Sequence, residues 1–241
     1  MKYNKIAGLD KNISKLIIGN DNQTNYDEAS KLWDYWIEVG GNAFDNAHMY
    51  GNGLMEKLLG KWQRSRNNLK NIILIAKGAH TPNCNPDSLS SQLEESLDRL
   101  QTNNVDIYIM HRDNKEIPVG EFIDVLNDRK NKNKFKIFGA SNWSLERFIE
   151  ANVWAKKNNK SGFSILNNNL SLCKMIKPLW DGCVSSNDEK ILDYLEKTKT
   201  AHLSWSSQGR GYFLSDKKVQ EIENQISKNE TWRKPGEHSS G

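Results

Sequence analysis

The chain has 241 residues, of which 37% are hydrophobic and 27% are charged, and its formal net charge is +4. This composition is ordinary for a soluble globular protein with one substantial core. No apolar run is long enough to span a bilayer, the first residues lack the apolar segment of a signal peptide, and no nucleic-acid reader motif accompanies the basic run at 129–136. We therefore expect a cytoplasmic protein that binds neither membranes nor nucleic acids.

The number and spacing of the cysteines argue against a disulfide framework and against a metal site. Cys84, Cys173 and Cys183 form an odd, scattered set without Cys-x-x-Cys spacing. A disulfide framework and a metal site are therefore not expected, and a reducing compartment fits best.

Short apolar runs alternate with amphipathic helical runs from the start of the chain. The first strand is expected at 14–19, and residues 3–9 should either pair with it or cap the floor of a barrel. A helix over 26–39 follows, with Gly40-Gly41 as its end signal. The next strand begins at Asn42, and another helix begins at Leu54.

The same alternation continues through the middle of the chain. Further strands are expected at 71–76, 105–110, 136–140, 163–166 and 201–205, and further helices at 86–100, from 118, at 144–155 and at 188–196. The alternation predicts parallel strands with right-handed crossovers. The fold class is thus α/β, a TIM (β/α)8-type barrel with seven β/α units visible and the last unit missing or atypical.

The end of the chain departs from this pattern. One amphipathic helix is expected around Val219, Ile222 and Ile226, and no strand follows it. We assign 1–230 to a single barrel domain and 231–241 to a polar, disordered tail. A barrel without its last strand exposes two sheet edges, so self-association through these edges is expected.

Four polar side chains stand where successive strand-like runs stop. Asp45 and Tyr50 follow the second run, Lys77 the third and His111 the fourth. Each residue alone is more often structural, but the carboxyl ends of barrel strands share one rim, so the four should meet there. A buried Asp keeps a neighbouring Lys charged, the Lys lowers a phenol pKa from about 10 towards neutrality, and a His orients a carbonyl or relays a proton. The set suits protonation of a carbonyl oxygen while its carbon receives a nucleophile.

The pattern Asp45-x-Ala47-x-x-Tyr50-Gly51, followed by Glu56, resembles the signature of the aldo-keto reductases. The resemblance extends from about residue 6 to residue 213. It implies a catalytic tetrad of Asp45, Tyr50, Lys77 and His111, with Tyr50 as general acid. It also implies that NADPH delivers hydride to an aldehyde or ketone substrate.

The same resemblance implies cofactor contacts later in the chain. Ser141 and Asn142 would bind the nicotinamide carboxamide, and Asn167 replaces the usual Gln with a shorter amide whose contact is lost or made through water. Trp205 stands where the family places the ring that stacks on nicotinamide. The loop that resembles the pyrophosphate wrap consists of Ser206, Ser207, Gln208, Gly209 and Arg210. No later stretch resembles the family's grip on the adenosine 2′-phosphate, so weak NADPH binding by the isolated chain is expected.

Two other functions fit the same residues. One is a non-catalytic barrel remnant that acts as a binding or regulatory partner, which the absent eighth strand motivates. The other is an aldolase-type reaction through a Schiff base on Lys77, which Asp45 disfavours because a Schiff-base lysine must be neutral to attack. The sequence does not identify the carbonyl substrate.

Overall fold

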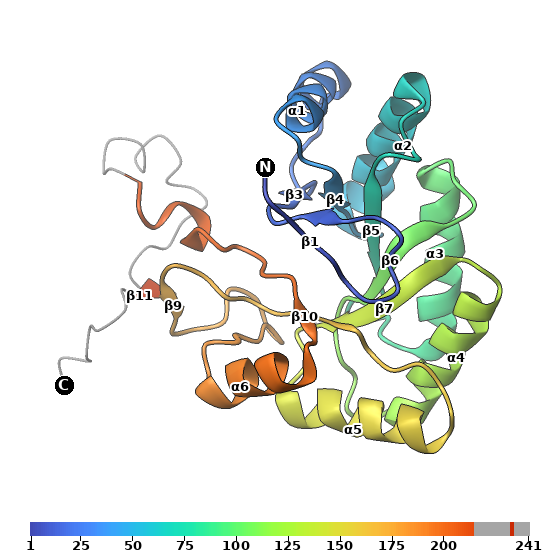
Figure 1. Ribbon diagram of the computed structural model, residues 1–241, viewed down its shortest axis with the longest axis vertical. Helices are drawn as coiled ribbons and strands as arrows, with labels where there is room; N and C mark the ends of the chain where they lie inside the picture. The colour runs from blue at the N-terminus through green and yellow to red at the C-terminus, as the bar shows by residue number, and fades with distance from the viewer. Residues whose placement is uncertain (215–231, 234–241) are drawn as a thin grey trace.

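The computed structural model describes residues 1–214 and 232–233, and a seven-stranded sheet lies at its centre. In spatial order the strands are β10 (Ala201–His202), β8 (Ile165–Asn167), β7 (Phe135–Ser141), β6 (Val105–Met110), β5 (Ile73–Gly78), β4 (Ala43–Asp45) and β3 (Ile18–Gly19). Every neighbouring pair is parallel. The sheet curls as an incomplete barrel (Figure 1). The predicted α/β fold is confirmed, and no eighth unit is evident in the described residues.

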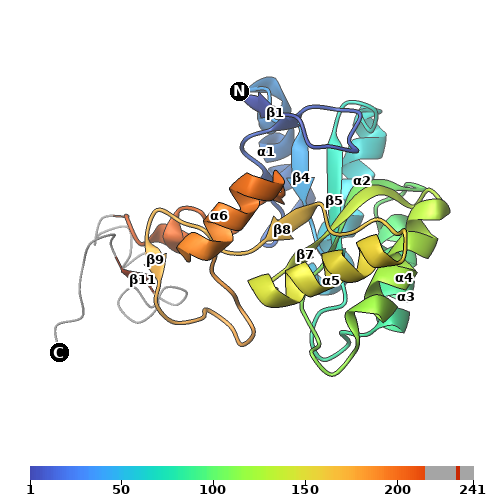
Figure 2. The same ribbon diagram turned by 60° about the horizontal axis from the view of Figure 1, so that its bottom comes forward.

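Helices cover the outer face of the sheet (Figures 1 and 2). They are α1 (Tyr26–Glu38), α2 (Leu54–Arg66), α3 (Pro86–Arg99), α4 (Val119–Asn131), α5 (Leu145–Lys157) and α6 (Glu189–Thr198). Side chains that accept hydrogen bonds from first-turn amides mark four helix starts: Asn25, Asn85, Ser144 and Asp188. Within the described part of the chain, no helix is long and apolar enough to cross a membrane.

The main core lies between the helices and the sheet, and a second apolar cluster fills the barrel interior. The second cluster takes alternate residues of the central strands, among them Ile75, Ile107 and Ile137. Short strands β1 (Tyr3–Asn4) and β2 (Ile13–Ser14) pair antiparallel, and the segment between them adds Ile6 and Leu9 to the same cluster. The amino-terminal segment therefore closes the floor of the barrel and leaves the opposite rim for a site.

Several strand boundaries differ from the prediction. The run at 14–19 is not one strand, because Ser14 pairs in the floor and its hydroxyl donates to Leu16 O at 2.7 Å, where the chain turns towards β3. The seventh strand ends at His202, since Trp205 is held instead by a bridge to Asn169. β5 (Ile73–Gly78) is shifted along the chain from the expected 71–76, and β7 (Phe135–Ser141) is longer than the expected 136–140, so these strands include Lys77 and Ser141.

A segment beyond β8 projects from the side of the sheet in both views (Figures 1 and 2). In it, β9 (Lys174–Met175) pairs antiparallel with β11 (Trp232–Arg233). The expectation of a polar tail without a strand over 231–241 is wrong at these two residues, because composition does not reveal which backbone groups meet in space. The helix expected around residues 219–226 lies outside the described residues.

Candidate active site

Asp45 and Lys77 form an ion pair at the carboxyl ends of β4 and β5. Lys77 Nζ lies 2.5 Å from Asp45 Oδ2, and the exposed fractions of the two side chains are 3% and 21%. Register explains the contact, because Asp45 pairs with Ile75 and the side chain two residues further along β5 points to the same face. Burial alone would lower the Lys77 pKa, but Asp45 and Tyr50 outweigh burial and raise it. The lysine is therefore held as a charged ammonium.

Tyr50 lies beside this pair, in the short 3-10 helix η1 (Tyr50–Gly53). Its ring centroid is 5.2 Å from Lys77 Nζ and 5.7 Å from the His111 ring, which it meets edge-on. Burial raises the pKa of the Tyr50 phenol by more than Lys77 lowers it. The expected net lowering of the phenol pKa is thus wrong, because desolvation disfavours the phenolate more strongly than one ammonium favours it. The group is held as a protonated phenol.

A buried ion pair between Arg99 and Glu56 stabilises the loop that carries Tyr50. Arg99 on α3 donates to His48 O at 3.0 Å and to Glu56 Oε2 at 3.2 Å, and Glu56 is fully buried. Gly53 has φ +85°, and a Cβ there would lie 2.5 Å from the Arg99 guanidinium carbon. Sequence reasoning included Glu56 in a signature but missed Arg99, since a basic residue in the last turn of a helix is common in any helix.

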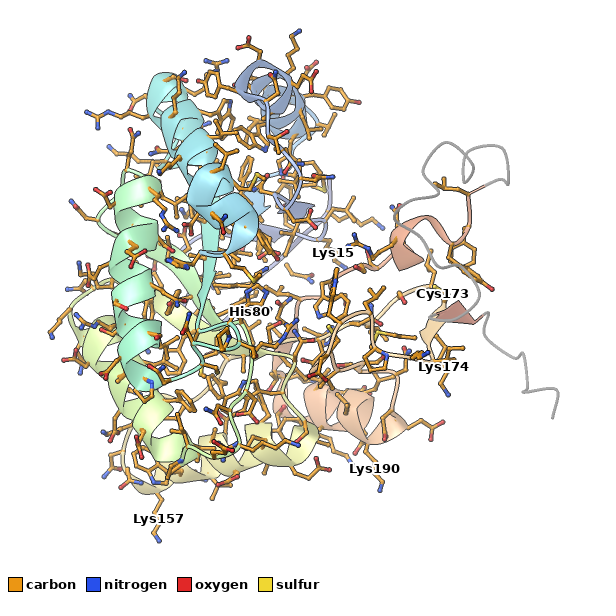
Figure 3. The ribbon with its side chains drawn as sticks, turned by 180° about the vertical axis from the view of Figure 1, so that it is seen from behind. Lys15, His80, Lys157, Cys173, Lys174 and Lys190 are labelled. Carbon is orange, nitrogen blue, oxygen red and sulfur yellow. The ribbon has the colours of Figure 1, made fainter. Side chains whose placement is uncertain are left out.

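His111 is the fourth member of this cluster and is 8% exposed. Its Nδ1 is buried and has no hydrogen-bond partner among the described residues. Burial, together with Lys77, His80 and Arg112, lowers the His111 pKa well below its usual value. The ring is therefore neutral. The His80 ring meets it edge-on at 4.8 Å, and Figure 3 places His80 near the middle of the molecule.

Ser141, Asn142 and Asn167 also come together, but their polar atoms contact one another and their neighbours. Ser141 Oγ donates to Asn167 O at 2.7 Å and accepts from Asn142 Nδ2 at 3.0 Å. Asn142 Oδ1 accepts from Val184 N at 3.1 Å, and Asn167 Nδ2 donates to Leu203 O at 2.6 Å. The Ser141 hydroxyl keeps one acceptor lone pair, since a hydroxyl has two.

Trp205 begins the loop that was expected to wrap a pyrophosphate. Asn169 Nδ2 donates to Trp205 O at 2.9 Å, while the buried Trp205 Nε1 has no partner among the described residues. Ser206 and Arg210 both have left-handed backbone angles, with φ +49° and +48°. The Arg210 guanidinium lies 5.1 Å from the centroid of the Trp180 ring.

One cavity of about 1480 Å³ joins these groups. The predicted site residues that line it are Asp45, Tyr50, Lys77, His111, Ser141, Asn142, Asn167, Trp205, Ser206, Ser207, Gln208 and Arg210. Gly209 does not line the cavity, because it packs against Cys173, whose sulfur would lie 2.2 Å from an added Cβ. The volume exceeds the 300–1,000 Å³ range common for small-molecule sites. With a free hydroxyl lone pair and a guanidinium among its lining residues, the cavity has the room and the polar groups to take a large ligand beside a second, smaller one.

Comparison with the sequences of known proteins provides independent evidence about the family of this chain. An aldo-keto reductase of Alternaria alternata is 25% identical over 82% of this chain and 64% of its own length. An uncharacterised oxidoreductase of Bacillus subtilis is 25% identical over 65% of this chain and 54% of its own length. A probable aryl-alcohol dehydrogenase of Saccharomyces cerevisiae is 26% identical over 82% of this chain and 61% of its own length. The chain thus spans about half to two thirds of these curated relatives.

The fold comparison agrees. A crystal structure of a thermostable aldo-keto reductase with the inhibitor epalrestat superposes with a TM-score of 0.73 at 21% identity, covering 93% of this chain and 79% of that one. At this identity the likeness is one of fold. The profile of the Aldo/keto reductase family matches residues 15–236, which is most of the chain. The protein therefore belongs to the aldo/keto reductase family.

Proposed function

We propose that the protein reduces an aldehyde or ketone with NADPH and that Tyr50 is the general acid. The observation that carries this proposal is the cluster of Asp45, Tyr50, Lys77 and His111 in one wall of the large cavity. Membership of the aldo/keto reductase family supports carbonyl reduction as the general chemistry.

The opposite wall would hold the cofactor. Ser141 offers its free lone pair to an amide N–H of the nicotinamide, and Trp205 offers an aromatic face. Arg210 offers positive charge to the pyrophosphate, since no carboxylate forms an ion pair with it in the described part of the chain. NADPH, when bound, supplies the hydride.

The proton then comes from the protein. The raised pKa of the Tyr50 phenol keeps its proton in place until a carbonyl oxygen develops negative charge. Lys77 stabilises the phenolate that Tyr50 becomes, and Asp45 keeps the ammonium charged. Neutral His111 can hold the carbonyl oxygen by a hydrogen bond. A charged Lys77 is a poor Schiff-base nucleophile, so the aldolase alternative is disfavoured.

Titration with NADPH, followed by tryptophan fluorescence, tests the cofactor part. Saturable quenching is expected, with a smaller amplitude in Trp205→Phe. The matched control is Trp154→Phe, because Trp154 lies on α5 and does not line the cavity. Absence of quenching at millimolar NADPH would refute cofactor binding, and absence of aldehyde-dependent NADPH oxidation would refute the reductase activity.

A second candidate function is that of a non-catalytic binding or regulatory partner. In the described sheet, β3 and β10 each pair on one side. A probable voltage-gated potassium channel subunit beta of Oryza sativa is 28% identical over 66% of this chain and 51% of its own length. Light scattering after size-exclusion chromatography tests this proposal: self-association is expected, and a compact monomer with a sharp thermal transition would count against it.

A further inference from the structure

Arg112 is a buried cation that lacks a carboxylate partner among the described residues. It is 7% exposed. Lys77 pairs with Asp45, and Arg147 pairs with Asp113, the residue that follows Arg112 in the chain. An uncompensated buried charge is costly. The position of Arg112 therefore points to an anion that the described residues do not supply.

The Arg112 side chain is also held in place. The backbone that carries it is fixed, because the backbone carbonyl oxygen of Arg112 accepts from the Cys84 thiol and from Trp143 Nε1, both at 3.2 Å. The backbone of Gly182 lies over the side chain, since an added Cβ would be 3.7 Å from Arg112 Cδ and 3.8 Å from Nε. A ligand would thus meet a guanidinium whose position is fixed before binding.

Most of the hydrogen-bonding capacity of Arg112 is unused. Its Nη1 donates to His111 O at 3.1 Å, and its Nη2 contacts the Cys183 sulfur at 3.7 Å. A guanidinium has five N–H donors, and a thiol sulfur is a weak acceptor. Several donors therefore remain for an oxyanion.

These donors belong to the cavity that contains the reactive groups. Arg112 lines it together with Tyr50, Lys77 and His111. Its charge helps to lower the pKa of both His80 and His111, so it acts on the part of the cavity where the carbonyl group would lie.

We propose that Arg112 binds a carboxylate of the substrate, so that the protein acts on aldehydes or ketones that also carry a carboxylate. A guanidinium fork matches a carboxylate in two parallel hydrogen bonds. The inference rests on the proposed reductase function, which places the carbonyl group at Tyr50 and His111. A phosphate of the cofactor is the other source of an oxyanion in this cavity, and the experiment separates the two.

The kinetic test compares para-carboxybenzaldehyde with para-carbamoylbenzaldehyde, which has nearly the same shape but no charge. Wild-type protein should prefer the carboxylate by on the order of tenfold to a hundredfold in kcat/KM, the range for a hydrogen-bonded charged group. Arg112→Met should abolish this ratio, and Arg112→Lys should restore part of it. Lys115→Met is the matched control, because Lys115 lines the same cavity but is exposed, and it should keep the ratio. Equal kcat/KM values in the wild type, or equal loss of the ratio in Lys115→Met, would overturn the proposal.

Binding provides a readout that does not need turnover. Para-carboxybenzaldehyde should raise the Tm of wild-type protein more than its carbamoyl analogue does, and this difference should vanish in Arg112→Met. The variant should fold, since Met is of similar length and its substitution removes the cost of burying a charge without a partner. If neither aldehyde is reduced, the proposed function fails, while this thermal shift still decides the role of Arg112. An unchanged shift in Arg112→Met, or a fall in NADPH affinity as large as that for the carboxylate, would overturn the proposal.

Discussion

The two walls of the cavity are built in different ways. On the β4–β6 side, Asp45 and Lys77 lie within paired strands and neutralise each other's charge. On the β8–β10 side, the last strand has two residues, and Trp205 lies on the loop beyond it with an indole nitrogen that has no partner in the described region. The ion pair of the first wall is complete without a ligand, whereas in the second wall the Arg210 guanidinium has no carboxylate partner among the described residues. In the proposed function, proton transfer uses the fixed geometry of the first wall, and a bound cofactor would contact the free groups of the second.

Removing the proton donor should give the largest effect on the first wall. Tyr50→Phe keeps the ring, and thus the packing, but removes the phenolic proton. We expect a loss in turnover of about 10²–10⁴ with cofactor binding retained. Steady-state kinetics together with NADPH titration measure both quantities, and Tyr35→Phe at an exposed site on α1 is the control. Unchanged turnover in Tyr50→Phe would remove this residue from the mechanism.

Breaking the ion pair of the first wall should cost stability. Asp45→Asn leaves Lys77 buried and charged without its partner, which we expect to cost about 3 kcal/mol and to lower the Tm by about 6–12 °C. Calorimetry at neutral pH measures the change. In the control, Asp193→Asn breaks a pair with Lys197 whose side chains are 57% and 74% exposed, and the effect should stay below about 0.5 kcal/mol. Similar Tm changes in both variants would mean that the buried pair has no special importance.

Lowering the pH should reduce the stability of the folded protein through protonation of His202, at the end of β10 in the second wall. Burial lowers the His202 pKa from 6.5 to about 4, and its ring nitrogens face the Ser204 and Ser186 hydroxyls at 2.9 and 3.0 Å. The unfolded chain therefore takes up a proton near pH 6.5, whereas the folded protein does so near pH 4. The free energy of unfolding should fall by about 2 kcal/mol across this interval on account of this ring. Urea titrations at several pH values should show a smaller fall in His202→Gln, and an identical fall in both proteins would contradict the assignment.

The smallest effect is expected for Ser141, at the end of β7 in the wall proposed to hold the cofactor. Ser141→Ala removes the bond to Asn167 O and the acceptor for Asn142. We expect a loss of about 1 kcal/mol of stability, a Tm lower by about 2–4 °C and a NADPH affinity reduced by less than about tenfold. Thermal unfolding and fluorescence titration measure these changes, with exposed Ser91→Ala on α3 as the control. A full loss of binding would mean that the hydroxyl is more central than its contacts indicate.

The same contrast explains how much the sequence could predict. Asp45, Lys77 and His111 follow apolar runs of strand length, and parallel register then places them on one rim. Gly209 was assigned to the cavity from its neighbours in sequence, but its packing against Cys173 depends on how a distant loop folds back. Burial is also a property of the assembled fold, which is why the direction of the Tyr50 pKa shift was missed. Local pattern thus predicts strand-borne groups, while loop geometry and desolvation depend on tertiary contacts.

The closed floor of the barrel has a consequence for the order of folding. Ile6 and Leu9 pack in the same cluster as Ile137 and Ile165, more than a hundred residues later in the chain. Such contacts form slowly, because a long loop must close before any apolar surface is buried. During synthesis, the buried contacts of Ile6 and Leu9 therefore form only after β8 (Ile165–Asn167) has emerged from the ribosome. Until then Ile6 and Leu9 are exposed to chaperones and proteases, although in the finished fold the two residues are only 8% and 6% exposed.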